Sequence, residues 1–305
     1  MSELFDLIIL GAGPAGISAA IYAARAKLNT LWLDKKFVTG GQITDTYEVD
    51  NYPGIPGVTG MELGEAMGAH AKRLGISPVR ENVLSIEDAG DHKIVRTKKH
   101  EYHTKTILAA LGAAHRKLQI PGEEEFGGMG VSYCATCDGA FFKDQTTVVI
   151  GGGNVAVEDA IFLSRICKKV YVVHRREELR ADKVLQDRLF ACENVEMVWN
   201  AIPLSIEGET QVTGLRIQEK NTPEERLIPT DGVFIAVGIT PNSSLFQEIV
   251  QMDENGYLIA GEEGITSTPG IFAAGDIRTK SLRQVVTAVS DGANAVTSVQ
   301  KYLLR

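Results

Sequence analysis

Two cysteines stand two residues apart in the run Cys134-Ala135-Thr136-Cys137, directly before Asp138. Thiols at this spacing can close a small disulfide ring, and such pairs serve as redox centres. The chain also carries two glycine-rich turns, at residues 11–16 and 151–156. Each turn has the form that binds a dinucleotide at the start of a helix. The sequence therefore predicts an oxidoreductase that relays electrons between two nucleotide cofactors and a dithiol.

The first glycine turn lies within a predicted strand–helix–strand unit. Residues 7–10 and 30–34 are apolar runs typical of strands, and the residues between them predict a helix. In this motif the glycines permit a tight turn, close approach to a pyrophosphate and close helix packing, and an acidic residue binds the ribose. The predicted cofactor-binding residues are Gly11, Gly13, Pro14, Ala15, Gly16, Asp34 and Lys35.

The second glycine turn repeats this plan between strands predicted at 147–150 and 170–173. Here a basic segment replaces the acidic residue, and guanidinium groups can grip a 2′-phosphate that a carboxylate would repel. The pattern favours NADPH over NADH, although a solvated basic patch would have the same composition. The predicted residues are Gly151, Gly153, Asn154, Val155, Ala156, His174, Arg175, Arg176 and Arg180.

If the second turn takes NADPH, the first is better suited to FAD, which can accept a hydride and reduce a disulfide. The C-terminal region supports this interpretation. Residues 270–276 predict a strand that ends in Asp276, whose carboxylate could bind a polyol. A helix predicted to begin at Leu282 could direct its N-terminal dipole at a reduced ring. The alternative is an ordinary strand, turn and helix.

The bulk properties narrow the functional class. The 305 residues suffice for two domains, and 44% hydrophobic with 23% charged residues is ordinary globular composition. A net charge of −8 gives no indication of a basic surface that would bind nucleic acid. No apolar run approaches the length needed to span a membrane. The acidic first residues favour a cytoplasmic protein. Cys167 and Cys192 are interpreted as bystanders, and because no second ligand pair follows Cys134 and Cys137, no metal site is predicted.

The chain resembles the bacterial-type, low-molecular-weight NADPH-dependent thioredoxin reductases over essentially its whole length. The motifs that carry the resemblance are residues 11–16, Gly40-Gly41-Gln42, Asn51-Tyr52-Pro53-Gly54, residues 134–139, residues 151–158, His174-Arg175-Arg176 with Arg180, and Gly275-Asp276 with Arg283-Gln284. One departure is Leu111-Gly112-Ala113, where relatives usually have Thr-Gly. It leaves open the contact expected at Gly112.

The resemblance implies a thioredoxin-disulfide reductase of the α/β class with two Rossmann-like, three-layer ββα domains. An NADPH-binding and redox domain at 117–241 would be inserted into a FAD-binding domain formed by 1–116 and 242–305. It also implies a homodimer with thioredoxin as the protein partner. Further FAD contacts would lie at Gly40, Gly41, Gln42, Asn51, Asp276, Arg283, Gln284 and Val285.

Within the dithiol, the resemblance assigns Cys137 to the flavin and Cys134 to attack on the partner disulfide. Asp138 is the expected acid and base, although a helix N-cap or first-turn acid with no catalytic part is the alternative. We expect both cysteines at the start of a helix that runs to Phe142, where the helix dipole favours thiolate.

The order of the motifs predicts movement. Because the dithiol and the NADPH turn share the middle domain, that domain should rotate about crossings near 113–116 and 238–243. Two other functions stay open: the same cofactors with a glutaredoxin-like or peroxiredoxin acceptor, and a non-catalytic dinucleotide sensor.

Overall fold

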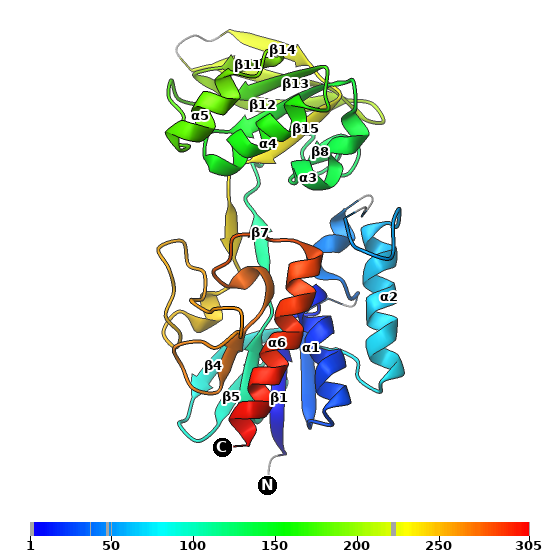
Figure 1. Ribbon diagram of the computed structural model, residues 1–305, viewed down its shortest axis with the longest axis vertical. Coiled ribbons are helices and arrows are strands. Elements are labelled where there is room, and N and C mark those ends of the chain that lie inside the picture. The colour runs from blue at the N-terminus through cyan, green and yellow to red at the C-terminus, as the bar shows by residue number, and fades with distance from the viewer. Residues whose placement is uncertain (1–2, 37, 47–48, 50, 221–223, 305) are drawn as a thin grey trace. The chain divides into compact units, whose positions relative to one another are not determined.

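The computed structural model describes residues 3–36, 38–46, 49, 51–220 and 224–304. The chain forms two compact units (Figure 1): unit 1 comprises residues 1–114 and 240–305, and unit 2 comprises residues 115–239. The two crossings are the short strands β7 (Ala113–His115) and β16 (Ile239–Pro241), which pair with each other. No helix in the described part of the chain combines the length and apolar character that crossing a bilayer requires.

Unit 1 is built on a seven-stranded sheet. Its strands β1, β2, β3, β6 and β17 run parallel, and β5 and β4 extend the sheet in antiparallel fashion. Residues Leu7 to Leu10 of β1 are fully buried, as expected for a central strand covered on both faces. The bounds are β1 (Leu4–Leu10), β2 (Thr30–Asp34), β3 (Val79–Arg80), β4 (Val83–Asp88), β5 (Lys93–Thr97), β6 (Glu101–Ala109) and β17 (Ile271–Ala273).

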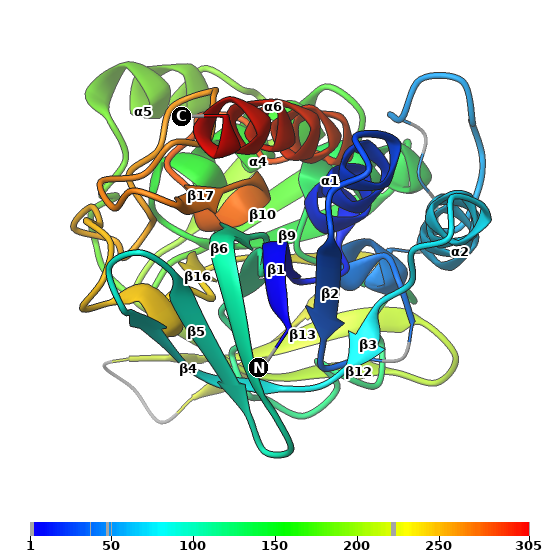
Figure 2. The same cartoon turned by 90° about the horizontal axis from the view of Figure 1, so that it is seen from below.

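Helices α1 (Pro14–Arg25) and α6 (Val285–Leu303) pack against each other over one face of this sheet (Figure 2). Helix α2 (Gly60–Arg73) packs beside α1, and Thr59 with Glu62 forms a capping box at its start. A second apolar cluster covers the opposite face. Short 3₁₀ turns complete the unit: η1 (Gly41–Asp45), η3 (Ser244–Phe246) and η4 (Gly275–Ile277).

Unit 2 has three layers. One apolar cluster lies between a five-stranded parallel sheet and a three-stranded antiparallel sheet, and another lies between the parallel sheet and the helices. The parallel sheet has the order β11 (Val195–Val198), β10 (Lys169–Val173), β9 (Thr146–Gly151), β15 (Gly232–Ala236) and β8 (Val131–Ser132). The remaining elements are β12 (Ala201–Gly208), β13 (Val212–Glu219), β14 (Glu225–Pro229), α3 (Ala135–Asp138), η2 (Gly139–Phe142), α4 (Asn154–Ser164) and α5 (Lys183–Phe190). The predicted α/β class with Rossmann-like parallel sheets is confirmed.

Two expected helix bounds are wrong. The helix expected from Leu282 begins at Val285, because Gln284 still has extended backbone. The helix expected from the cysteines to Phe142 is a single α-helical turn that ends at Asp138 and continues as the 3₁₀ turn η2. One turn carries only a small dipole, so the structure gives little support to dipole stabilisation of a thiolate.

Candidate active site

In unit 2 the dithiol and the nucleotide turn lie at one edge of the same parallel sheet. Cys134 follows the carboxyl end of β8 and Gly151 ends β9, with only β15 between these strands. The carboxyl ends of parallel strands form the edge where α/β proteins bind ligands. Helix α3, which carries the cysteines, also packs against α4, which follows the nucleotide turn. The sheet topology therefore brings the two predicted redox features of this unit together.

Cys134 and Cys137 form a disulfide, with their Cα atoms 5.3 Å apart. Cys134 occupies the N-cap of α3, and Cys137 lies in its single turn. Both side chains are half-buried. The other two cysteines, Cys167 and Cys192, are not part of a disulfide and are free thiols. The structure therefore contains the predicted small disulfide ring.

The side chain of Asp138 is held by a residue that the sequence did not single out. Ser132 Oγ donates to Asp138 Oδ2 at 2.5 Å and accepts a hydrogen bond from the Cys134 N–H at 3.0 Å. Asp138 makes no capping bond to η2, but it is the acidic residue in the single turn of α3, so a stabilising first-turn acid stays the alternative to a catalytic one. Burial raises the pKa of Asp138, and the hydrogen bond from Ser132 acts in the opposite direction. Asp138 is therefore a half-buried carboxyl group with a raised pKa, next to Cys137 in the sequence.

The residue before Cys134 is fixed by a second contact. Tyr133 donates its hydroxyl to Glu123 at 2.7 Å, and its ring stacks on His115 with centroids 5.1 Å apart. Glu123 is 2% exposed and also accepts from two backbone N–H groups. Residues 132–134 are therefore held by Asp138, through Ser132, and by Glu123 and His115, through Tyr133.

Three hydrogen bonds tie the nucleotide turn of unit 2 to Arg180, at the end of the basic segment 174–180, and to Asp182 just beyond it. The Arg180 N–H donates to the Gly152 carbonyl at 2.7 Å, and the Asn154 side chain exchanges two hydrogen bonds of 2.9 Å with Asp182. The His174 ring packs where a Cβ on Gly152 would stand, 2.2 to 2.7 Å from its ring atoms. A glycine is therefore required at position 152.

The predicted phosphate-binding side chains differ in exposure. Arg175, Arg176 and Arg180 are exposed, whereas His174 is 5% exposed and its Nε2 lies 3.1 Å from the Glu178 carbonyl. Burial lowers the pKa of His174, which keeps the imidazole neutral at pH 7. The structure thus gives His174 a packing position under the turn. The other predicted residues, Gly151, Gly153, Val155 and Ala156, lie at the end of β9 and the start of α4.

In unit 1 the predicted flavin residues gather at the carboxyl edge of its parallel strands. Asp34 ends β2, and its Oδ2 accepts a hydrogen bond of 2.6 Å from the Ala12 N–H in the glycine turn. The Gly40 N–H donates to the Ala12 carbonyl at 2.8 Å, which joins the next loop to the turn. This edge carries Gly11, Gly13, Pro14, Ala15 and Gly16 after β1, Lys35 after β2, Gly40, Gly41 and Gln42 at η1, Gly112 after β6, and Asp276 after β17.

Two further contacts involve predicted residues of this unit. Asn51 Nδ2 donates to Gln284 Oε1 at 3.0 Å, directly before Val285 begins α6. The Arg283 guanidinium lies 4.2 Å from the centroid of the Tyr257 ring. Asp276 Oδ1 and Arg283 Nε are both buried, and neither has a hydrogen-bond partner among the described residues. Burial raises the pKa of Asp276 although cationic side chains lie near it.

A buried ion cluster supports the turn that carries Asp276. Asp291 accepts hydrogen bonds from the Gly275 N–H at 2.9 Å, from Arg278 at 2.6 and 2.9 Å, and from Lys280 at 2.8 Å. The side chains of Asp291, Arg278 and Lys280 are at most 9% exposed. Sequence reasoning missed this cluster. The available signal was an acidic residue in a helix otherwise rich in small and apolar side chains.

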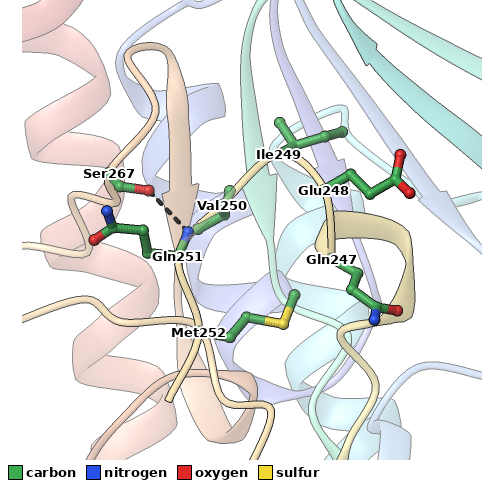
Figure 3. A pocket seen from close by; sticks show the side chains of 7 residues that line it. All are labelled: Gln247, Glu248, Ile249, Val250, Gln251, Met252 and Ser267. Carbon is green, nitrogen blue, oxygen red and sulfur yellow. Dashed lines mark hydrogen bonds between the residues drawn. The ribbon is translucent and has the colours of Figure 1, made fainter. Parts of the chain in front are cut away.

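An open pocket elsewhere in unit 1 contains none of the predicted residues. It is lined by Gln247, Glu248, Ile249, Val250, Gln251, Met252 and Ser267 (Figure 3). Ser267 Oγ accepts a hydrogen bond from the Gln251 N–H, so this hydroxyl is already used within the wall of the pocket. We assign no chemistry to this pocket.

Comparison with known proteins places the chain in a family. The model of the family described as pyridine nucleotide-disulphide oxidoreductase matches residues 5–292. The chain is 45% identical to the thioredoxin reductase of Listeria monocytogenes over 99% of its own length and 94% of the relative's. It is 44% identical to that of Bacillus subtilis over 99% and 96%, respectively.

The solved structure of thioredoxin reductase from Streptococcus pyogenes matches with a TM-score of 0.95 at 42% identity, covering 100% of this chain and 99% of that one. These similarities extend over both units and include the segments that carry the dithiol and the two glycine turns. The chain therefore belongs to the pyridine nucleotide-disulphide oxidoreductase family, among the thioredoxin reductases.

Proposed function

We propose that this chain is an NADPH-dependent thioredoxin-disulfide reductase that binds FAD and uses Cys134–Cys137 as its redox disulfide. The observation that carries the proposal is the closed disulfide at the same sheet edge as the nucleotide turn of unit 2. The names of the relatives support thioredoxin as the acceptor. We further propose that it acts as a homodimer in the cytoplasm.

Unit 1 has groups that fit a flavin nucleotide. The buried, unpartnered Asp276 Oδ1 is an acceptor suited to a hydroxyl group of the ribityl chain, and Arg283 Nε is a buried donor. Backbone amides of the glycine turn at the start of α1 suit a pyrophosphate. Bound FAD would supply two-electron exchange between a pyridine nucleotide and a disulfide. We propose that the residues gathered at this edge hold it.

Unit 2 has groups that fit NADPH. A Cβ added to Gly153 would meet no atom within 4 Å, so the backbone of the turn is open to a ligand. The contact between the Arg180 N–H and the Gly152 carbonyl holds the basic segment beside the turn. We propose that Arg175, Arg176 and Arg180 bind the 2′-phosphate, while His174 supports the turn from beneath through its packing against Gly152.

The dithiol residues would perform disulfide exchange. After reduction of the pair, the Cys134 thiolate attacks one sulfur of the partner disulfide, and the Cys137 thiolate then displaces the partner and restores the ring. Asp138 would transfer a proton to the departing thiolate, a task for which its perturbed pKa is suited. We assign the partner-facing role to Cys134 by its similarity to the family pattern.

Because residues 117–241 carry both the nucleotide turn and the dithiol, we propose that this domain rotates so that each reaches the flavin in turn. Residues 113–116 and 238–243 are the proposed hinges, and residues 1–116 with 242–305 form the proposed FAD domain. A covalent cross-link between the domains should abolish turnover and spare one half-reaction. Full turnover in the cross-linked protein would refute the rotation.

The function is tested with the purified holoenzyme, NADPH and separate disulfide acceptors. We expect rapid oxidation of NADPH with an oxidised bacterial thioredoxin, and slow oxidation with a glutaredoxin or a peroxiredoxin. A faster reaction with either of the other acceptors would overturn the assignment of thioredoxin.

A further inference from the structure

Ser132 combines deep burial with three polar contacts. It ends β8, and 5% of it is exposed. Its Oγ lies 2.5 Å from Asp138 Oδ2, accepts from the Cys134 N–H at 3.0 Å, and lies 3.3 Å from the Cys134 carbonyl oxygen. A hydroxyl has one proton to donate, and here that proton has two acceptors within reach. The hydroxyl can therefore turn between the carboxylate and the carbonyl group.

Among the described residues, the carboxyl group of Asp138 accepts one hydrogen bond, from the Ser132 hydroxyl to Oδ2. Its second oxygen, Oδ1, is buried and has no hydrogen-bond partner among the described residues. The elements packed most closely against α3 are α4 and η2; α4 carries Glu158 and Asp159, and η2 carries no titratable side chain. Neither acid of α4 contributes to the raised pKa of Asp138, which reflects burial opposed by the Ser132 hydrogen bond.

We propose that Ser132 is a positioning residue that supports Asp138 in both of its charge states, an inference that rests on the function proposed above. When Asp138 is ionised, the Ser132 hydroxyl donates to Oδ2. When Oδ2 carries a proton, it donates to Ser132 Oγ, and the hydroxyl proton turns to the Cys134 carbonyl. Because Oδ2 stays hydrogen-bonded in both states, the half-buried carboxyl group loses no hydrogen bond when it exchanges a proton.

This arrangement serves the exchange with the partner disulfide. The Cys134 thiolate bonds to one partner sulfur, the partner S–S bond breaks, and the departing thiolate takes the proton from Asp138. Ser132 then donates to the new carboxylate. The Cys137 thiolate next bonds to the Cys134 sulfur, and the second partner thiolate leaves and is protonated by solvent. Two electrons have passed from the enzyme dithiol to the partner, and the Cys134–Cys137 disulfide is restored.

The first test follows the protonation of Asp138 directly. The carboxyl band of the oxidised holoenzyme is titrated by infrared difference spectroscopy and identified by its loss in Asp138→Asn. Ser132→Ala removes the hydrogen bond from both charge states, but the bond to the carboxylate is the stronger because its acceptor is ionised. The midpoint should therefore move upward by about one pH unit. Ser132→Cys, which keeps the volume but donates weakly, should move it in the same direction. Ser132→Thr retains the hydroxyl and should keep the wild-type midpoint. An unchanged midpoint in Ser132→Ala and Ser132→Cys, or an equal shift in Ser132→Thr, would overturn the proposal.

The second test follows the exchange reaction. Pre-reduced holoenzyme is mixed with an oxidised bacterial thioredoxin in a stopped-flow instrument across a range of pH. Because the acid form of Asp138 donates the proton, the alkaline decline in rate should move to higher pH in Ser132→Ala. A coincident decline in wild type and Ser132→Ala would refute the role of Ser132. If the wild-type enzyme reduces no thioredoxin, the proposed function fails, and the infrared titration still decides the role of Ser132.

Discussion

Replacing Asp291 with asparagine should destabilise unit 1 strongly. Asp291 is 4% exposed and compensates two buried cations, Arg278 and Lys280, whose side chains are 9% and 7% exposed. Removing one partner of a buried ion pair typically costs about 3–5 kcal/mol, because the remaining charge stays buried. For a unit of this size the loss corresponds to a decrease in Tm of roughly 6–20 °C. The turn at Gly275 would also lose its anchor, so FAD should be retained less well.

The unfolding of unit 1 can be followed by itself. The chain has two tryptophans, Trp32 in unit 1 and Trp199 in unit 2, so a Trp199→Phe background leaves fluorescence that reports on unit 1 alone. Urea unfolding of Asp291→Asn is compared in this background with Glu87→Gln as control. Glu87 pairs with Arg96 on the surface, where loss of the ion pair should cost less than about 1 kcal/mol. If Asp291→Asn is no less stable than the control, the cluster does not stabilise the unit.

The difference in stability between wild type and Asp291→Asn should depend on pH in a defined direction. Burial acts to raise the pKa of Asp291, but the hydrogen bonds from Arg278 and Lys280 outweigh it and the net shift is downward. A lowered pKa in the folded state stabilises the protein above the unfolded pKa, about 3.9, and this contribution disappears as pH falls through the folded value. The stability difference between wild type and Asp291→Asn should therefore be constant from neutral pH to about pH 5 and shrink below it.

Three further changes test the other parts of the site. Substituting Arg175, Arg176 and Arg180 together with glutamine should raise KM for NADPH about tenfold or more and leave KM for NADH unchanged, as steady-state kinetics would show. Equal effects on both nucleotides would contradict a 2′-phosphate contact. Gly152→Ala should cost about 1–3 kcal/mol in urea unfolding and weaken NADPH binding, because its Cβ overlaps the buried imidazole ring; an unchanged variant would show that the ring is free to move. Cys137→Ser should keep flavin reduction by NADPH and lose thioredoxin reduction, whereas a dinucleotide sensor would keep its response to a partner.

Much of the fold could be predicted because its signals are local. The strand predicted at 30–34 is β2, and the strand predicted at 170–173 lies within β10. The strands predicted at 7–10 and 147–150, which lie within β1 and β9, each run directly into a turn whose glycine spacing allows few other structures. The disulfide could also be predicted from a local pattern, because two cysteines separated by two residues can close a small ring. The structure contains that disulfide, between Cys134 and Cys137.

The contacts missed by sequence reasoning join residues whose pairing has no local pattern. Ser132 and Asp138 are six residues apart on different elements, and nothing in their spacing indicates that one turn of helix returns the carboxylate to the strand end. Asp291 could pair with any of 31 lysines and arginines, and only the packing of α6 on the Gly275 turn selects its partners. The position of His174 likewise depends on the space that Gly152 leaves for its ring.

The central claim is that a flavin bound to this protein receives electrons from NADPH and delivers them to the Cys134–Cys137 disulfide. An anaerobic titration of the purified holoenzyme tests it directly. Addition of NADPH should bleach the flavin absorbance, and subsequent addition of oxidised thioredoxin should restore it in wild type but not in Cys137→Ser. A protein that retains no FAD when supplied with it, or a bleached flavin that thioredoxin reoxidises equally well in Cys137→Ser, would contradict the account.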